Sequence, residues 1–371
     1  MTEPGSAQDA PTPRGTPAPP TRTVLIVGAI ALAVVGGLVG GLLVRATTSA
    51  SGNEPASVCP ATGVAEQVLP SVVKITARGA TSGGGTGSGE IIRTGGYILT
   101  NDHVISVAAN GGKLSVLYND GRTSEATIVG RDPVTDLAVI KAVDKAEDRP
   151  LIRIGSSASL RVGQPVVALG APLGLYGTVT SGIVSALGRY VPIPRGGGKV
   201  AHLVDAIQTD ASINPGNSGG ALVDCAGDLV GVNSAISTVP NAEGIGGGGN
   251  VGIGFAIPVD LAKPFADQLI ETGRVSHPVI GMEVQTLPAA VAARSGTPAG
   301  LFVVGVVPGG PAASAGLRAG DVITSVDGAP AARAEQLTVL TLTRTAGDTV
   351  PITYSRDGVA TDTEITLAAP E

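Results

Sequence analysis

The chain has 371 residues and a formal net charge of −6, so it allows one or two compact domains plus tails and lacks the basic surplus of a nucleic-acid-binding protein. Aromatic residues make up only 2% of the chain, whereas 55 residues are glycine and 27 are proline, a composition that favours many short aliphatic strands over long helices. The sequence has no CxxC motif or His/Cys cluster, so it predicts no metal site and no cofactor.

The N-terminal segment predicts a tail and a membrane anchor. Residues 1–23 are rich in proline, threonine and alanine and can bury too little apolar surface to fold, so we expect a disordered tail. Residues 24–44 are uncharged, and as a helix they would span roughly 31 Å, which matches a hydrocarbon core of ~30 Å. A cleaved signal peptide is the alternative, but its apolar region usually has ~7–15 residues. We therefore expect an uncleaved transmembrane helix.

Basic residues flank this predicted helix. Arg14 and Arg22 precede it, and Arg45 follows it. The positive-inside tendency places the N-terminus in the cytoplasm and the folded part of the chain outside the cell membrane. Residues 45–60 are rich in serine, threonine and alanine, which is typical of a flexible linker.

The chain has two cysteines, Cys59 and Cys225. Cys59 precedes the first predicted strand, and Cys225 lies at the tip of a predicted hairpin. Because a cysteine pair in an exported domain is usually oxidised, we expect a disulfide that ties the N-terminal lead to the folded domain. Two free surface thiols are the alternative.

Short apolar runs separated by turn signals predict two sets of strands. A short helix near Val64–Leu69, ended by Pro70, precedes them. The first set comprises Val72–Thr76, Gly89–Arg93, Tyr97–Thr100, Leu114–Tyr118, Ala126–Val129, Leu137–Lys141 and Val166–Gly170. The second set comprises Gly177–Leu187, Leu203–Thr209, Gly220–Val223, Leu229–Ala235 and Gly252–Ile257. Each set fits one small barrel, and a single β-sandwich is the alternative.

His103 and Asp136 are the candidate base and acid of the first set. His103 lies where an apolar strand runs into a polar turn, and Asp136 ends a turn and opens an apolar strand. A carboxylate at the edge of a core is costly unless it is paired, and an imidazole would supply the partner. The rival acids are Asp102, which would point away from its neighbour on an extended chain, and Asp132, which precedes a proline as turn residues do. The other histidines are interpreted as surface or satisfied core residues: His202 and His277.

Ser218 is the candidate nucleophile. It lies in Asn214-Pro215-Gly216-Asn217-Ser218-Gly219-Gly220, which predicts a tight turn with a hydroxyl at its tip. Glycine permits the backbone to turn so that the amide N–H groups of Gly216 and Ser218 point at one spot, where an oxyanion could bind. Alone, the pattern is compatible with an ordinary glycine-rich hairpin turn. With His103 and Asp136 it predicts a triad in the chain order of chymotrypsin-like proteases.

The C-terminal part predicts a helix and a further domain. Residues 258–272 have near-helical apolar spacing, with Pro258 at the start and Gly273 at the end. Pro264 inside the run either kinks the helix or marks its true start. We therefore expect a connecting helix within residues 261–275.

Three motifs closely resemble the HtrA/DegP family of serine proteases: Thr100-Asn101-Asp102-His103-Val104, Thr135-Asp136-Leu137-Ala138-Val139 and Gly216-Asn217-Ser218-Gly219-Gly220. The resemblance covers roughly residues 60–371. It implies a mainly β fold, with two six-stranded chymotrypsin-like barrels over residues 61–260 and the active site in the cleft between them. Asp102 departs from the family, which usually has an uncharged residue there. We expect the extra carboxylate to raise the basicity of His103 without removing function.

Residues 276–371 look like one PDZ domain of α+β type, on the landmarks Ile280-Gly281-Met282-Glu283-Val284 and Gly316-Leu317-Arg318-Ala319-Gly320-Asp321-Val322-Ile323. Backbone N–H groups at Ile280, Gly281 and Met282 would hold the carboxylate of a peptide that adds as a strand to the sheet edge. A turn that merely enters a strand is the alternative.

The resemblance also implies loops and a pocket around the serine. It identifies residues 190–199 and 240–250 with regulatory and specificity loops, although both are equally compatible with plain surface loops. It implies that Ile253, Gly254 and Phe255 line the pocket for the first substrate side chain. The residues of this segment, 252–257, are mostly small and aliphatic, which predicts a preference for small or medium apolar side chains.

Together these features predict a membrane-anchored serine endopeptidase that acts on unfolded or regulatory exported proteins in protein quality control and the stress response. By resemblance we expect a homotrimer regulated by C-terminal peptides at the PDZ domain. An anchored chaperone or scaffold that binds without cleavage is the alternative, as is a protease dedicated to one substrate.

Overall fold

The computed structural model describes residues 59–370 except for 172–176, 196–199 and 237–250. The predicted tail, transmembrane helix and most of the linker lie outside these residues. Within the described part of the chain, every helix is too short or too polar to cross a bilayer.

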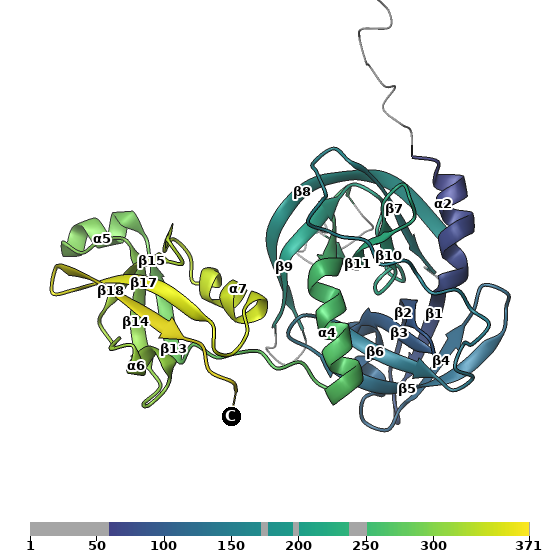
Figure 1. Cartoon of the computed structure of the whole chain (residues 1–371), viewed down its shortest axis with the longest axis horizontal. Coiled ribbons are helices and arrows are strands. Elements are labelled where there is room, and N and C mark those ends of the chain that lie inside the picture. The colour runs from purple at the N-terminus through teal and green to yellow at the C-terminus, as the bar shows by residue number, and fades with distance from the viewer. Residues whose placement is uncertain (1–58, 172–176, 196–199, 237–250, 371) are drawn as a thin grey trace, which may run out of the picture. The chain divides into compact units, whose positions relative to one another are not determined.

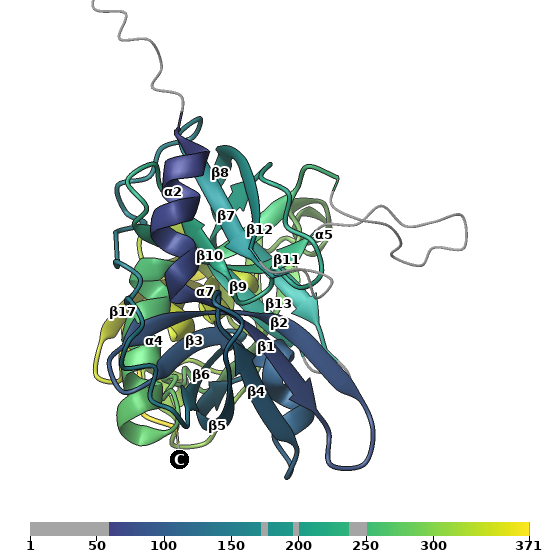
Figure 2. The same ribbon diagram turned by 90° about the vertical axis from the view of Figure 1, so that its right-hand side faces the viewer.

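The first described element is the helix α2 (Ala61–Val68), followed by the 3₁₀ turn η1 (Leu69–Ser71). The helix starts three residues earlier than the sequence suggested, and Pro70 lies inside the 3₁₀ turn instead of ending α2. Proline is tolerated there because the N–H groups of the first residues in a helical turn have no acceptor within the helix, so the N–H that proline lacks is not missed. Buried Val64 and Val68 are one helical turn apart, and α2 lies beside β7 and β8 (Figure 2).

The first barrel closes in the order β1-β2-β3-β6-β5-β4 (Figure 1). Its strands are β1 (Val72–Arg78), β2 (Gly84–Arg93), β3 (Tyr97–Asn101), β4 (Lys113–Leu117), β5 (Thr123–Asp132) and β6 (Leu137–Ala142). Alternate side chains point inward, as the two-residue period of a strand requires, so Val73, Ile75 and Ala77 of β1 all lie in the barrel core.

The second barrel closes in the order β10-β11-β12-β9-β8-β7. Its strands are β7 (Pro165–Gly170), β8 (Thr178–Pro194), β9 (Val200–Thr209), β10 (Ala221–Val223), β11 (Leu229–Ile236) and β12 (Gly254–Pro258). The sequence assigned residues 166–170 to the first barrel, and this was wrong: β7 pairs with β8 and β10. An apolar run predicts a strand but carries no information on which strand it pairs with.

One apolar cluster joins both barrels to the helix α4 (Val259–Thr272). It includes Leu99 of the first barrel, Leu169 of the second and Leu269 of α4, all nearly or completely buried. The helix starts at Val259, so Pro264 does not mark its start, and Gly273 ends it in the left-handed conformation with φ 77°. The close approach of α4 to β5 depends on Gly130, where an added Cβ would lie 2.7 Å from the carbonyl oxygen of Gly273.

The C-terminal domain has its own sheet in the order β13-β14-β15-β17-β18, with β16 beside β15. Its elements are β13 (Met282–Leu287), α5 (Ala289–Ser295), β14 (Gly300–Val306), α6 (Pro311–Ser314), β15 (Val322–Val326), β16 (Ala329–Pro330), α7 (Glu335–Thr343), β17 (Thr349–Arg356) and β18 (Val359–Thr366). A separate core holds this domain together. The order leaves β13 at a sheet edge.

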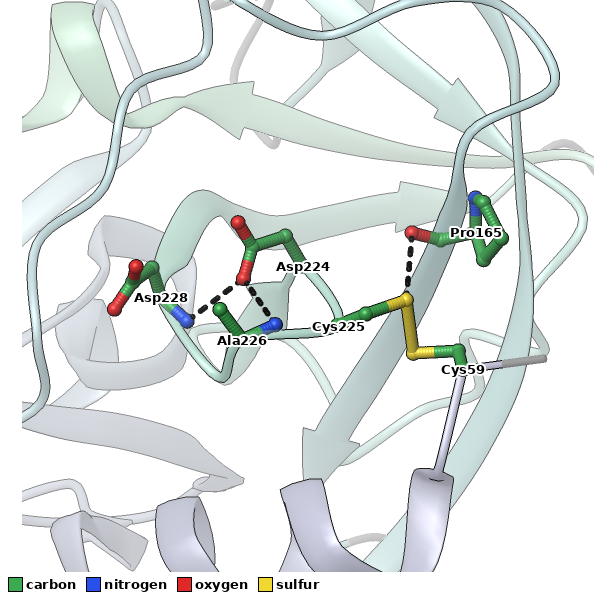
Figure 3. The surroundings of a disulfide bond; sticks show 6 residues. All are labelled: Cys59, Pro165, Asp224, Cys225, Ala226 and Asp228. Carbon is green, nitrogen blue, oxygen red and sulfur yellow. Dashed lines mark hydrogen bonds between the residues drawn. A yellow bond between two sulfur atoms is a disulfide. The ribbon is translucent and has the colours of Figure 1, made fainter. Parts of the chain in front are cut away.

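A disulfide joins Cys59 to Cys225 across a sequence separation of 166 residues, with the two Cα atoms 5.1 Å apart (Figure 3). Cys225 lies in the hairpin between β10 and β11, where Asp224 accepts hydrogen bonds from the N–H groups of Ala226 and Asp228. The bond therefore ties the residue that precedes α2 to the second barrel.

Candidate active site

His103 is presented by a single helical turn. The strand β3 ends at Asn101, and α3 (Asp102–Ile105) follows, with Val104 and Ile105 buried as its apolar anchors. The imidazole Nδ1 lies 2.9 Å from Oδ2 and 3.0 Å from Oδ1 of Asp136, and the backbone N–H of His103 donates to Oδ1 at 3.1 Å. Both the backbone and the ring of His103 are thus directed at one carboxylate.

Asp136 lies in the turn between β5 and β6 and is 1% exposed. Its φ of 62° is in the left-handed region, which residues other than glycine rarely adopt. Two groups at the end of β3 and the start of α3 hold its backbone: the amide of Asn101 and the N–H of Asp102 donate to its carbonyl oxygen at 2.9 and 3.1 Å. The strained turn is therefore fastened to the same segment that carries His103.

The turn around Ser218 is held by the first barrel although it belongs to the second. Ser88 of β2 donates its hydroxyl to the Gly216 carbonyl at 2.7 Å and its N–H to the Ser218 carbonyl at 2.9 Å. Gly219 has φ 79°, and a Cβ there would lie 2.3 Å from Ser88 O and from Thr100 Oγ1. Only glycine allows this close approach, which brings the serine turn against β2 and β3.

Ser234 of β11 connects the serine to the acid. The hydroxyl of Ser218 donates to the backbone carbonyl of Ser234 at 3.2 Å, and the hydroxyl of Ser234 donates to Asp136 Oδ2 at 2.7 Å. In the described structure no hydrogen bond joins Ser218 to His103 directly. The structure thus brings His103 and Asp136 into direct contact. Ser218 is linked to Asp136 indirectly, through hydrogen bonds to and from Ser234.

The amide N–H groups of Gly216 and Ser218 donate to none of the described residues. Gly216 has φ 104°, so its peptide lies in a conformation that favours glycine. Backbone N–H groups of this kind, beside a serine hydroxyl and with no partner among the described residues, are chemically suited to bind an oxyanion.

Sequence reasoning missed two partners of Asp136. Ser234 was included only in a predicted strand, although a serine within that apolar run is a signal that its hydroxyl has a buried partner. Arg195 lies in the predicted loop over residues 190–199, and its Nη2 is 2.7 Å from Asp136 Oδ2 and 3.3 Å from His103 Nδ1. A single arginine in a Gly- and Pro-rich loop gives no signal of such a contact.

Asp102 lies in a different backbone conformation from the one that the sequence predicted. This residue starts α3 and is not part of an extended chain, so the argument from opposite faces was wrong. Its carboxylate accepts from Arg131 Nε at 2.6 Å, and burial raises the pKa of Asp102 in spite of that arginine. The charge that was expected to act on His103 is therefore paired with Arg131.

The remaining candidates from the sequence have partners of their own. Asp132 accepts from His277 Nε2 at 2.8 Å and from the hydroxyl of Thr135 and does not contact His103. His202 Nδ1 lies 2.7 Å from the hydroxyl of Tyr190, and burial lowers the pKa of His202. Neither histidine contacts the candidate triad in the described structure.

The predicted pocket residues lie beside Ser234. In the pairing of β11 with β12, Phe255 is opposite Ala235 and Gly254 is opposite Ile236, while Ile253 immediately precedes β12. A Cβ on Gly254 would lie 2.8 Å from the Cδ1 atom of Ile213, so an apolar side chain faces this position.

In the C-terminal domain, Ile280 and Gly281 precede the edge strand β13, which begins at Met282. The carbonyls of Ile280 and Gly281 accept from the N–H groups of Ala312 and Val307 at 3.0 and 2.9 Å. Gly281 has φ 72°. These bonds fix the loop from its inner side, next to a strand whose outer edge is unpaired in the sheet.

Two family models match the chain: the trypsin-like peptidase domain over residues 87–232 and the PDZ domain over residues 278–367. The chain is 42% identical to the serine protease PepD of Mycobacterium tuberculosis, over 95% of this chain and 79% of that protein. It is 39% identical to the periplasmic pH-dependent serine endoprotease DegQ of Escherichia coli, over 81% and 69%. The solved structure of the HtrA-type protease AlgW with a decapeptide superposes with a TM-score of 0.66 at 34% identity, over 84% of this chain and 99% of that chain.

Proposed function

Because the chain belongs to the HtrA/DegP family of serine endoproteases with a trypsin-like domain and one PDZ domain, we propose that Ser218, His103 and Asp136 form its catalytic triad. One observation carries the assignment: a buried carboxylate lies 2.9 Å from His103 Nδ1 and is connected through Ser234 to the hydroxyl of Ser218.

In the proposed reaction, Ser218 Oγ attacks the carbonyl carbon of the scissile peptide bond while His103 Nε2 takes the hydroxyl proton. The hydroxyl must first turn from the Ser234 carbonyl toward His103, and catalytic hydrogen bonds often tighten only when substrate is bound. The N–H groups of Gly216 and Ser218 hold the oxyanion. His103 then gives its proton to the leaving amine, and water hydrolyses the acyl-enzyme with the same imidazole as base.

Asp136 accepts from the Nδ1–H group of His103, which keeps the proton off Nε2 and leaves that nitrogen free to act as base. Its negative charge also stabilises the imidazolium that forms during the reaction. The reaction needs no cofactor. Ile253, Gly254 and Phe255 are the proposed pocket for the first substrate side chain, which their environment suits to small or medium apolar residues.

The cellular role follows from the same proposal. Residues 24–44 anchor the chain in the cell membrane with the N-terminus in the cytoplasm and the protease and PDZ domains outside. Relatives named as periplasmic endoproteases support an extracytoplasmic site of action. The substrates are unfolded or damaged exported proteins, and the enzyme works as a homotrimer.

We propose further that C-terminal peptides bind at Ile280, Gly281 and Met282, add as a strand beside β13, and regulate cleavage. The peptide complexes named for AlgW support a peptide ligand. An unpaired strand edge next to a loop with available backbone groups suits this mode of binding.

The test compares the full chain in detergent with its Ser218→Ala variant on unfolded casein. We expect the variant to lose turnover by about 10³-fold or more while its fold and peptide binding are unchanged. A fluorophosphonate probe should label Ser218 of the unaltered chain only. Cleavage by the variant at the unaltered rate would refute the triad, and an unaltered chain that neither cleaves nor reacts with the probe would favour a chaperone or scaffold. Cut sites mostly after lysine or arginine would refute the proposed pocket.

A further inference from the structure

The turn that carries Asp136 is held by a second carboxylate. Asp132 begins this turn, and its Oδ1 accepts from the N–H of Val134 at 3.2 Å while its Oδ2 accepts from the hydroxyl of Thr135. The side chain of Asp132 is only 5% exposed. Because Thr135 directly precedes Asp136, these bonds restrain the backbone of the turn immediately before the catalytic acid.

The third partner of Asp132 comes from a distant part of the chain. His277 follows α4 on the segment that leads to the PDZ domain, and its Nε2 lies 2.8 Å from Asp132 Oδ2. The ring packs edge-on against Phe265 of α4, with centroids 5.5 Å apart and planes at 87°. Phe265 thereby fixes the direction in which Nε2 points.

This contact matters because Asp136 is held in an unfavourable conformation. Its φ of 62° persists only while the surrounding structure enforces it. The backbone of the turn is also held by the N–H of His202, which donates to the Val134 carbonyl at 2.7 Å. Without His277, Asp132 would keep only partners from within the turn, and a buried carboxylate with an unfilled lone pair would draw water or rearrange.

We infer that His277 is a positioning residue for catalysis: by donating to Asp132 it holds the β5–β6 turn so that Asp136 stays at 2.9 Å from His103 Nδ1. This inference rests on the proposed triad. His277 does not touch the substrate or the reacting atoms. Its loss therefore misplaces the acid without changing the binding surface, which predicts a lower kcat at an unchanged KM.

The experiment uses the full chain with single substitutions and a peptide substrate. His277→Ala should lower kcat by about tenfold with KM within about twofold, since small displacements of catalytic groups are costly. His277→Gln, whose Nε2 can still donate to Asp132, should recover most of that loss. Ser276→Ala is the matched control, because its hydroxyl lies one residue away in the same segment and bonds to none of the described residues, and it should match the unaltered enzyme.

Two further variants separate positioning from a merely structural role. Asp132→Asn should lower kcat to a similar degree, and the double variant with His277→Ala should be no worse than the poorer single variant, because both act through one contact. Titration of active sites with a fluorophosphonate should show the same fraction of active enzyme in the unaltered chain and in every variant, so that a lower kcat is not due to misfolded protein. If His277→Ala does not fold, His277→Leu removes the donor while keeping apolar volume against Phe265.

The outcomes are distinct from those that test the triad. A His277→Ala or His277→Leu enzyme with the unaltered kcat would overturn the inference while leaving the triad intact. Additive effects of the Asp132 and His277 substitutions, or failure of glutamine to recover activity, would overturn it as well. Loss of the triad assignment itself would show only in Ser218→Ala, as continued turnover.

Discussion

At the scale of single residues, the Asp136 carboxylate has three side-chain partners: the ring of His103, the hydroxyl of Ser234 and the guanidinium of Arg195. The residue types and their spacing predict His103, Asp136 and Ser218 as the triad, an assignment that stays a proposal. They could not reveal Ser234 or Arg195. Each of these side chains bonds to Asp136, which lies about 60 to 100 positions away in the sequence, and neither residue type indicates such a partner.

Ser234 offers a direct test of how Asp136 is held. Ser234→Ala removes one donor to Oδ2, and a hydrogen bond to a charged group contributes about 1.5–3 kcal/mol, so we expect kcat/KM to fall by about tenfold or more. Steady-state kinetics on a peptide substrate would measure this. Ser234→Thr, which keeps the hydroxyl, is the control, and an alanine variant as active as the unaltered enzyme would contradict the role given to the hydroxyl.

Glu90 of β2 is a second residue-scale feature. It is completely buried, and neither carboxyl oxygen of its side chain has a partner among the described residues. Burial raises the pKa of Glu90 well above its ordinary value of 4.5. Below pH 4.5 the Glu90 carboxyl is protonated in both the folded and the unfolded state. As the pH rises above it, the unfolded state ionises while the folded state does not, so the free energy of unfolding decreases.

Glu90→Gln should therefore stabilise the protein, by a margin that grows as the pH rises from about 4.5 toward 7. Urea unfolding of both chains at pH 4 and pH 7 would measure the margin. Glu125→Gln on the exposed face of β5 is the matched control and should show a much smaller pH-dependent difference. A margin that shrinks with rising pH would show that Glu90 is ionised and paired in the folded state.

At the scale of elements, short apolar runs separated by turn signals identified most strands to within a few residues. The partner of β7 and the turn α3 were both missed. Strand pairing over long sequence separations depends on the whole fold, and a helix of four residues is too short to leave a periodic pattern. The consequence for Asp102 was direct, because its orientation was argued from an extended chain.

Two glycines in or against helices should respond to alanine with opposite signs. At Gly130 the added methyl would meet the backbone of Gly273 at 2.7 Å and push α4 from β5, so we expect Gly130→Ala to destabilise the fold by about 1–3 kcal/mol. A Cβ added at Gly63 in α2 would meet no atom of the described residues within 4 Å apart from nearby atoms of its own helix, so Gly63→Ala should raise the free energy of unfolding by about 0.5–1 kcal/mol. Chemical denaturation would measure both, and equal shifts would contradict the account of α4 packing.

At the scale of the whole molecule, the sequence motifs sufficed to predict two barrels and a PDZ domain, and both are present in the fold. The membrane anchor and most of the linker lie outside the described residues, so they stay predictions. The trimer also stays a prediction, because the contacts that would form it are made between separate chains and a single sequence does not encode them as a readable pattern.

The disulfide affects how a cut in the polypeptide chain would be detected. Because Cys59 and Cys225 are covalently joined, one nick anywhere between them produces two fragments that travel together until a reductant is added. The upstream fragment carries Cys59 and the downstream fragment carries Cys225. Ser218 lies in the downstream fragment only if the cut falls before that residue. A preparation that runs as one band on a non-reducing gel can thus already be cut, and the two fragments separate only after the disulfide is reduced with a thiol.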